Sequence, residues 1–120
     1  MTQEERSIRY VLKFEKLAGR NPKDVSKLHI GYDVKSGSRY IEVKSRPGSR
    51  IQPFILLQNT ILRTLGRKIS NFYIYIVYDM KNAPKLVVID PEAIFKNLVP
   101  DVKLRLPKSA YGKIKFISLK

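Results

Sequence analysis

The run from Phe72 to Tyr78 constrains the fold of this chain more than any other segment. It reads Phe-Tyr-Ile-Tyr-Ile-Val-Tyr, so it is apolar or aromatic at every position. β-Branched and aromatic residues favour extended structure. A strand that is apolar on both of its sides is typical of the middle of a sheet covered on each face. The run therefore predicts a central, buried strand in a layered α/β fold.

Three tyrosines of this run, Tyr73, Tyr75 and Tyr78, have two interpretations. They could stack on nucleic-acid bases, as aromatic side chains do in proteins that bind single strands. Their spacing within an apolar strand instead favours burial, because tyrosine contributes a large apolar surface to a core. We predict that they belong mainly to the core.

The first half of the chain supplies a helix and a hairpin. Apolar residues recur at helical spacing over residues 3–18, and Gly19 follows as a stop signal. Residues 28–35 and 39–46 have the alternating pattern of two strands. We expect a tight turn centred on Ser36-Gly37 to join them.

The second half continues the α/β pattern. Residues 51–57 fit either a third strand or the beginning of a helix, and residues 58–65 fit a helix. A further strand is expected over 85–89, a short helix from Pro91 to Leu98, and an edge strand over 114–119. The expected architecture is a mixed α/β sheet flanked by helices, with an α-β-β-β-α-β core.

Length and composition limit the alternatives. A chain of 120 residues fits a single domain, 1–120. Because it has no cysteine, it has no disulfide, thiolate zinc site or cysteine nucleophile. The lone histidine, His29, argues against sites that need several histidines, and we expect it in a loop or at a strand edge.

The location of the protein is also predicted from the sequence. The beginning of the chain is polar and acidic, which is unlike a signal peptide. The longest apolar run is far too short to cross a bilayer. We therefore expect a soluble cytoplasmic protein with no membrane partner.

The charge of the chain points to a polyanionic partner. It has 24 Lys and Arg against 10 Asp and Glu, a formal net charge of +14. Such an excess is most often found in proteins that bind nucleic acid. No acid lies between Val43 and Tyr78, although a solvated basic face is an equally good explanation of this segment. The candidate phosphate contacts are Arg46, Arg50, Arg63, Arg67 and Lys68.

One segment of this basic chain carries the residues for phosphodiester chemistry. Glu42 and Lys44 are two residues apart on a predicted strand, so they share a face. With the turn at Ser36-Gly37, Asp33 falls opposite Tyr40 and diagonal to Glu42, roughly 7–8 Å away. Carboxylate oxygens hold Mg²⁺, and a nearby lysine supplies positive charge where negative charge develops.

The predicted first helix offers a further carboxylate for such a site. Glu4 or Glu5 is the better placed candidate, and Glu15 the weaker one, if the helix packs beside the hairpin. Each also has an ordinary structural explanation. Acids at a helix N-terminus are favoured by the helix dipole, and Glu15 could pair with an arginine.

The order of elements and several short motifs resemble the PD-(D/E)XK nuclease superfamily, which includes many restriction enzymes and archaeal Holliday-junction resolvases. Within it, the sequence is similar to the domain found at the C-terminus of the plant protein NO VEIN and attached to some helicases and restriction-type proteins. About the first half of the chain carries the resemblance, in Phe14-Glu15-Lys16, Gly19-Arg20, Asp24-Val25-Ser26, Gly31-Tyr32-Asp33 and Arg39-Tyr40-Ile41-Glu42-Val43-Lys44.

The resemblance implies a restriction-endonuclease-like fold and roles for individual residues. Asp33 and Glu42 would be metal ligands and Lys44 the catalytic lysine. In our own hypothesis, the Val43 carbonyl and a helix acid, Glu5, would complete the metal site. The resemblance also implies Mg²⁺, for which Mn²⁺ can substitute, no small-molecule cofactor, and DNA as substrate. A homodimer would allow both strands of a duplex to be cut. Where the family has Asn-Glu after the third strand, this chain has Asn59-Thr60, so an accessory acid is missing.

Two other functions remain open on the sequence alone. The chain could be a catalytically inactive DNA-binding or targeting module of the same fold, which Thr60 favours and the intact Asp33, Glu42 and Lys44 disfavour. It could also be an RNA-binding accessory protein, and the basic charge is the only support for this function.

Overall fold

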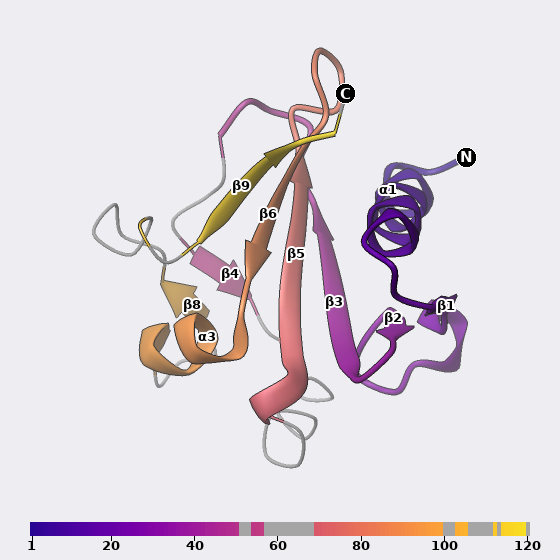
Figure 1. Cartoon of the computed structure of the whole chain (residues 1–120). Helices are drawn as coiled ribbons and strands as arrows, with labels where there is room; N and C mark the ends of the chain where they lie inside the picture. Colours follow the sequence, from indigo (N-terminus) through magenta and orange to yellow (C-terminus); the bar gives the residue numbers. More distant parts are fainter. Residues whose placement is uncertain (51–53, 57–68, 100–102, 106–111, 113, 120) are drawn as a thin grey trace.

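A computed structural model of the chain describes residues 1–50, 54–56, 69–99, 103–105, 112 and 114–119 (Figure 1). The fold is of the α/β class, with a six-stranded mixed sheet in the order β1-β2-β3-β5-β6-β9. Its strands are β1 (Pro22–Asp24), β2 (Val34–Ser36), β3 (Arg39–Ser45), β5 (Phe72–Tyr78), β6 (Lys85–Ile89) and β9 (Lys115–Ser118). A second sheet joins β4 (Phe54–Leu56), β8 (Lys103–Arg105) and β7 (Leu98–Val99). The helical elements are α1 (Gln3–Leu17), η1 (Ser26–Leu28), η2 (Ile69–Asn71) and α3 (Pro91–Asn97).

The apolar run from Phe72 to Tyr78 is the central strand β5. It pairs in parallel with β3 and antiparallel with β6. Phe72, Ile74 and Ile76 pack on one face, with α3, and Val77 packs on the other face, with α1. Figure 1 shows these two helices on opposite sides of the sheet. The prediction of a central strand covered on both faces is therefore confirmed.

The tyrosines of β5 follow the burial that was predicted, with one exception. Tyr75 is fully buried and Tyr78 is 9% exposed. Tyr73 is half-buried, and the guanidinium of Arg39 lies over its ring, 4.2 Å from the centroid. Core packing therefore accounts for Tyr75 and Tyr78, while Tyr73 lies at the border of the core.

Helix α1 begins and ends close to its predicted bounds. Thr2 is the N-cap, and its side chain and that of Glu5 form a reciprocal capping box. Ile8 and Val11 are buried against the sheet. At the other end, Gly19 has φ +85°, which favours glycine and ends the helix.

The hairpin differs from the prediction in its register. The turn residues are Gly37 and Ser38 rather than Ser36-Gly37, and Ser36 pairs with Arg39. Glycine at the first turn position accepts the positive φ of 57°. Moving the turn by one residue shifts the partner of each β2 residue by two positions along β3. Because side chains alternate between faces, paired residues still point to the same face. The partner next in line for Asp33 is therefore Glu42 and not Tyr40.

The first predicted strand was too long. Residues 28–33 form no strand, because His29 (φ 52°) and Gly31 (φ 99°) turn the backbone out of the extended conformation. Instead, Pro22–Asp24 forms β1, an edge strand that the sequence pattern did not predict and that pairs with β2.

Predictions for the second half are confirmed where the structure describes it. β6, α3 and the edge strand β9 lie within a residue of their expected bounds. The segment 51–57 contains strand β4, which belongs to the second sheet rather than to the main one. The helix expected over 58–65 lies outside the described residues. Among the helices of the described residues, none has the length and apolar character needed to cross a bilayer.

Two leucines test how much the layered core contributes to stability. Leu86 of β6 is fully buried, whereas Leu17, at the end of α1, is 80% exposed. Leu86→Ala should lower the free energy of unfolding by about 3–5 kcal/mol, because it leaves a cavity in the core. Leu17→Ala, the matched control, should change it by less than about 0.5 kcal/mol. Urea unfolding with unchanged slopes measures both, and equal effects would contradict this assignment of the core.

Candidate active site

The site arises because β3 is longer than the strand beside it. β2 pairs only with residues 39–41, whereas β3 continues to Ser45 along β5. Past Ile41, no described strand pairs with β3 on the β2 side. The backbone and side chains at this end of β3 are therefore open to a neighbour other than a strand.

Asp33 lies at the point where the β2–β3 ladder ends. Its N–H donates to the carbonyl of Ile41 (2.8 Å), and its carboxylate Oδ2 accepts the N–H of Val43 (2.8 Å). The side chain thus takes the place of a strand backbone along β3. Because this bond fixes the carboxylate, Asp33 is oriented before any ligand arrives.

Glu42 and Lys44 lie beside this carboxylate. The Glu42 carboxyl interacts electrostatically with that of Asp33, and Lys44 Nζ is 3.4 Å from Glu42 Oε2. Glu42 is 8% exposed. Burial, and then the adjacent Asp33 carboxylate, raise the pKa of Glu42 to about 9, while the positive charge of Lys44 opposes the rise. The structure therefore brings the three predicted residues together in one electrostatically coupled group.

This group opens into a pocket of about 790 Å³. One wall is the N-terminal turn of α1, including Gln3, Glu4 and Glu5. The loop between β1 and β2 forms a second wall, and the end of β3 from Glu42, with Arg46 after it, forms the third. The pair of carboxyls is accordingly not sealed in the core but faces a cavity of a size that admits a ligand.

The backbone carbonyl of Val43 also faces this side of the sheet. In a strand, the N–H and C=O of one residue point to the same neighbour. Because the Val43 N–H donates to Asp33, its carbonyl points towards the same open edge. This places a third hard oxygen near the two carboxyls.

The acids of α1 do not join the two carboxyls as the sequence had led us to expect. Glu5 lines the pocket, but its Oε1 accepts the Thr2 hydroxyl at 3.1 Å, within the capping box. Glu4 lines the pocket and is exposed. Within the part of the chain that the structure describes, there is no cluster of three or more Asp, Glu, His or Cys able to hold a metal ion. The described donors are thus Asp33 and Glu42, with the Val43 carbonyl.

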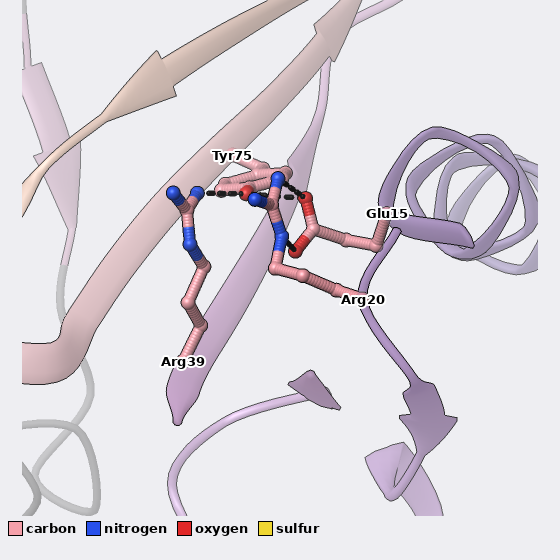
Figure 2. A network of polar contacts seen from close by, with 4 residues as sticks. All are labelled: Glu15, Arg20, Arg39 and Tyr75. Carbon is pink, nitrogen blue, oxygen red and sulfur yellow. Dashed lines mark hydrogen bonds and ion pairs between the residues drawn. The ribbon is translucent and has the colours of Figure 1, made fainter. Parts of the chain in front are cut away.

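Glu15 has a structural role away from the pocket (Figure 2). It is fully buried, and its Oε1 and Oε2 accept Arg20 Nε (2.5 Å) and Nη2 (2.8 Å). The hydroxyl of Tyr75 donates to Oε2 (2.7 Å) and accepts Arg39 Nη1 (2.8 Å). The alternative that Glu15 pairs with an arginine is the one that the geometry supports. The network attaches α1 to the central strand.

Only part of the predicted basic set lies in the described residues. Arg46 lines the pocket, and its Nη1 donates to the Ser45 carbonyl (2.8 Å). Arg50 is exposed. Arg63, Arg67 and Lys68 lie outside the described residues, as does Asn59-Thr60.

Two features of the pocket were not predicted from the sequence. His29 is in the loop, as expected, but it also lines the pocket and has left-handed backbone angles, φ 52° and ψ 46°. The hydroxyls of Ser7 and Ser45 both contact Met80 Sδ at 3.4 Å, which joins α1 to the ends of β3 and β5 behind the pocket. No local pattern predicts these contacts, because they depend on how distant segments pack.

Comparison with known proteins finds a match to a family model described as "Protein NO VEIN, C-terminal", over residues 3–89. The chain belongs to this family. Searches of curated proteins and of solved structures find no significant match. The segment matched by the NO VEIN C-terminal family runs from α1 through β6 and contains Asp33, Glu42 and Lys44.

The Glu15 network predicts a specific pH dependence of stability. Burial by itself raises the pKa of Glu15, but the hydrogen bonds from Arg20 and Tyr75 and the charge of Arg20 outweigh it, so the pKa is lowered. A lowered pKa stabilises the folded state above roughly pH 4.3, the ordinary pKa of glutamate, and this contribution is lost as the pH falls through the folded-state pKa.

Glu15→Gln should therefore lower the free energy of unfolding at pH 7 by about 1.5–3 kcal/mol, since it removes a charged hydrogen-bond acceptor. The difference from the wild type should shrink as the pH falls below about 4, because the carboxyl of the unfolded chain then takes up a proton, and it should level off below the lowered pKa of the folded state. Urea unfolding between pH 2.5 and 7 measures it. Glu4→Gln, on the same helix but exposed, is the control. A gap that stays constant with pH would contradict the assigned role.

Proposed function

We propose that this chain is a magnesium-dependent nuclease of the PD-(D/E)XK type that hydrolyses phosphodiester bonds in DNA. The observation that carries the proposal is the contact of Asp33, Glu42 and Lys44 in an open pocket. A net charge of +14 supports a polyanionic substrate. Membership of the NO VEIN C-terminal family is compatible with it.

The donors in the pocket fit Mg²⁺. Asp33, Glu42 and the Val43 carbonyl would hold it, all through hard oxygen atoms. Mg²⁺ usually binds one or two carboxylates and keeps waters and substrate phosphate as its other ligands, so a third acid is not needed. Mn²⁺ shares this preference for oxygen and would substitute. When bound, such an ion polarises the phosphate and lowers the pKa of a coordinated water.

The protein's own residues perform the other tasks. Val43 N–H holds the Asp33 carboxylate in place, so this group needs no reorganisation when substrate binds. Lys44, kept 3.4 Å from Glu42, presents a compact charge that orients the attacking water and neutralises the developing phosphoryl charge. Arg46 in the pocket wall would contact a phosphate oxygen.

The two carboxyls also support the proposal energetically. Placing them in contact in a buried position is unfavourable when both are ionised, as the raised pKa of Glu42 shows. A divalent cation between them would relieve this repulsion. Such an arrangement reduces stability unless a ligand compensates for it, which is typical of functional sites.

One substitution tests the proposal directly. Lys44→Ala should reduce Mg²⁺-dependent nicking of plasmid DNA by roughly 10²–10³-fold, the usual effect of removing one stabilising donor. Lys115→Ala, an exposed lysine on the edge strand β9, should leave the nicking rate unchanged. Single-stranded, duplex and branched DNA are compared in the same assay. Nicking that persists in Lys44→Ala and in Asp33→Ala would contradict the proposal.

A non-catalytic DNA-binding or targeting module is the second candidate, because Thr60 stands where the resemblance calls for an acid. Calorimetry separates the two. A nuclease should bind Mg²⁺ or Mn²⁺ through Asp33, and Asp33→Asn should weaken this binding. Tight DNA binding without metal binding or cutting would establish the module, and a preference for RNA over DNA would favour an accessory RNA-binding role.

The described part of the chain holds one such group, so one visit would cut one strand. Cutting both strands of a duplex would require two copies, and we propose a homodimer on the substrate. Sedimentation with and without a duplex measures this. A monomer that makes only nicks would leave the catalytic proposal intact and remove the dimer.

A further inference from the structure

A basic stripe runs along the outer side of α1, and the proposed active site does not use it. It consists of Arg6, Arg9, Lys13 and Lys16, spaced three, four and three residues apart. At 3.6 residues per turn, this spacing places all four within an arc of roughly 80°. All four side chains are exposed. The buried residues Ser7, Ile8, Val11 and Glu15 lie on the opposite side of the helix.

The charges of the stripe are not compensated within the described residues. Neighbouring members are three or four residues apart, a spacing at which like charges repel and destabilise a helix. None of the four forms an ion pair with a described acid. Glu15 is turned inward and bound by Arg20, and Glu5, one turn before Arg9, is held by Thr2. The unrelieved repulsion is what an anionic partner would remove.

We propose that this stripe binds the phosphate backbone of the nucleic acid, beyond the pocket. For the class of ligand, this inference rests on the proposed function. The stripe extends about 15 Å along the helix from Arg6 to Lys16. Duplex DNA carries one charge per roughly 1.7 Å of its axis, so several phosphates fall within this length.

The stripe and the pocket lie near the same end of α1 but on different sides of the helix. The stripe begins at Arg6, next in the chain to the pocket-lining residues 3–5, whereas Ser7 and Ile8, which also line the pocket, lie opposite it. Figure 1 shows α1 on the β1–β3 side of the sheet, the side on which β3 forms the pocket. A duplex that contacts both would therefore have to pass around the beginning of the helix.

Other anionic partners fit α1 less well. A helix that lies on a membrane inserts its apolar face into the lipid. The apolar face of α1, with Ile8 and Val11, is already buried against the sheet. An acidic protein partner would be expected to meet a cluster of aromatic or aliphatic anchors, whereas the stripe is made of charged residues and has only the single exposed Leu17 beside it on α1.

The test measures DNA affinity by fluorescence anisotropy across a range of salt concentrations, with EDTA present so that nothing is cut. For duplex DNA, log affinity decreases linearly with log salt concentration, and this slope becomes shallower by roughly 0.9 for each phosphate that the protein no longer neutralises. Lys13→Gln with Lys16→Gln should therefore lower the slope by about 1.8, and Gln at all four positions by about 3.6. Glutamine is a good helix former, so the melting temperature should not fall.

The matched control removes two lysines elsewhere. Lys96 of α3 and Lys115 of β9 are exposed, and α3 lies on the other face of the sheet. The double change Lys96→Gln with Lys115→Gln should leave the salt slope unchanged. An unchanged slope in the stripe variants, or an equal decrease in the control, would overturn the inference. The inference would also be overturned if the stripe variants bound phosphatidylserine vesicles or polyglutamate more weakly but kept the DNA affinity of the wild type.

The outcome is independent of catalysis. If Lys44→Ala abolishes nicking while the stripe variants keep the full slope, the stripe is not a phosphate surface and the nuclease proposal stands. If nothing is cut but the slope falls as expected, the stripe binds DNA and the nuclease proposal fails.

Discussion

The burial of β5 on both faces is the constraint on which the rest of this structure depends. An apolar strand of seven residues must be covered from two sides, and α1 and α3 supply the covers. On the α1 side, the cover is also attached by polar contacts, because Tyr75 of β5 reaches the buried carboxylate of Glu15. The position of α1 follows from this attachment, and the N-terminal turn of α1 is a wall of the pocket.

The site itself results from a difference in strand length. β2 has only three residues because its preceding loop contains backbone angles that exclude extended structure, at His29 and Gly31. β3 continues for seven residues because β5 supports it on the other side. Asp33, Glu42 and Lys44 meet at the end of β3 that has no strand partner on the β2 side. A longer β2 would have covered this edge with backbone hydrogen bonds and left no room for a ligand.

The sequence predicted the features that depend on local periodicity and not those that depend on distant contacts. β5, β6 and α1 have strong patterns and were placed correctly. The face shared by Asp33 and Glu42 survived an error in the turn position, because a change of two residues preserves strand parity. β1 was missed because its sequence, Pro-Lys-Asp, has little strand preference and pairs only through β2.

The contribution of α1 to the pocket was only partly anticipated for a related reason. A helix acid near the hairpin was expected, and Glu4 and Glu5 do reach the pocket wall. Their chemistry could not be read from spacing alone. Glu5 is used by the capping box, a local contact, and Glu15 by a residue 60 positions away, a contact visible only after folding.

Most acids in the described part of this basic chain divide into two kinds. Several have a structural task that accounts for them, as partners of a backbone N–H or a nearby cation: Glu5, Glu15, Asp24, Asp79, Asp90 and Glu92. Asp33 and Glu42 also have such partners, the Val43 N–H and Lys44, but their two carboxyls lie close together as well, at a cost that the raised pKa of Glu42 reflects. The bond from the Val43 N–H gives Asp33 a structural task at the end of the β2–β3 ladder. It does not explain why the carboxyl of Glu42 is buried beside that of Asp33. An unfavourable pair that opens into a pocket is the arrangement expected of a functional site, which is why the proposal rests on it.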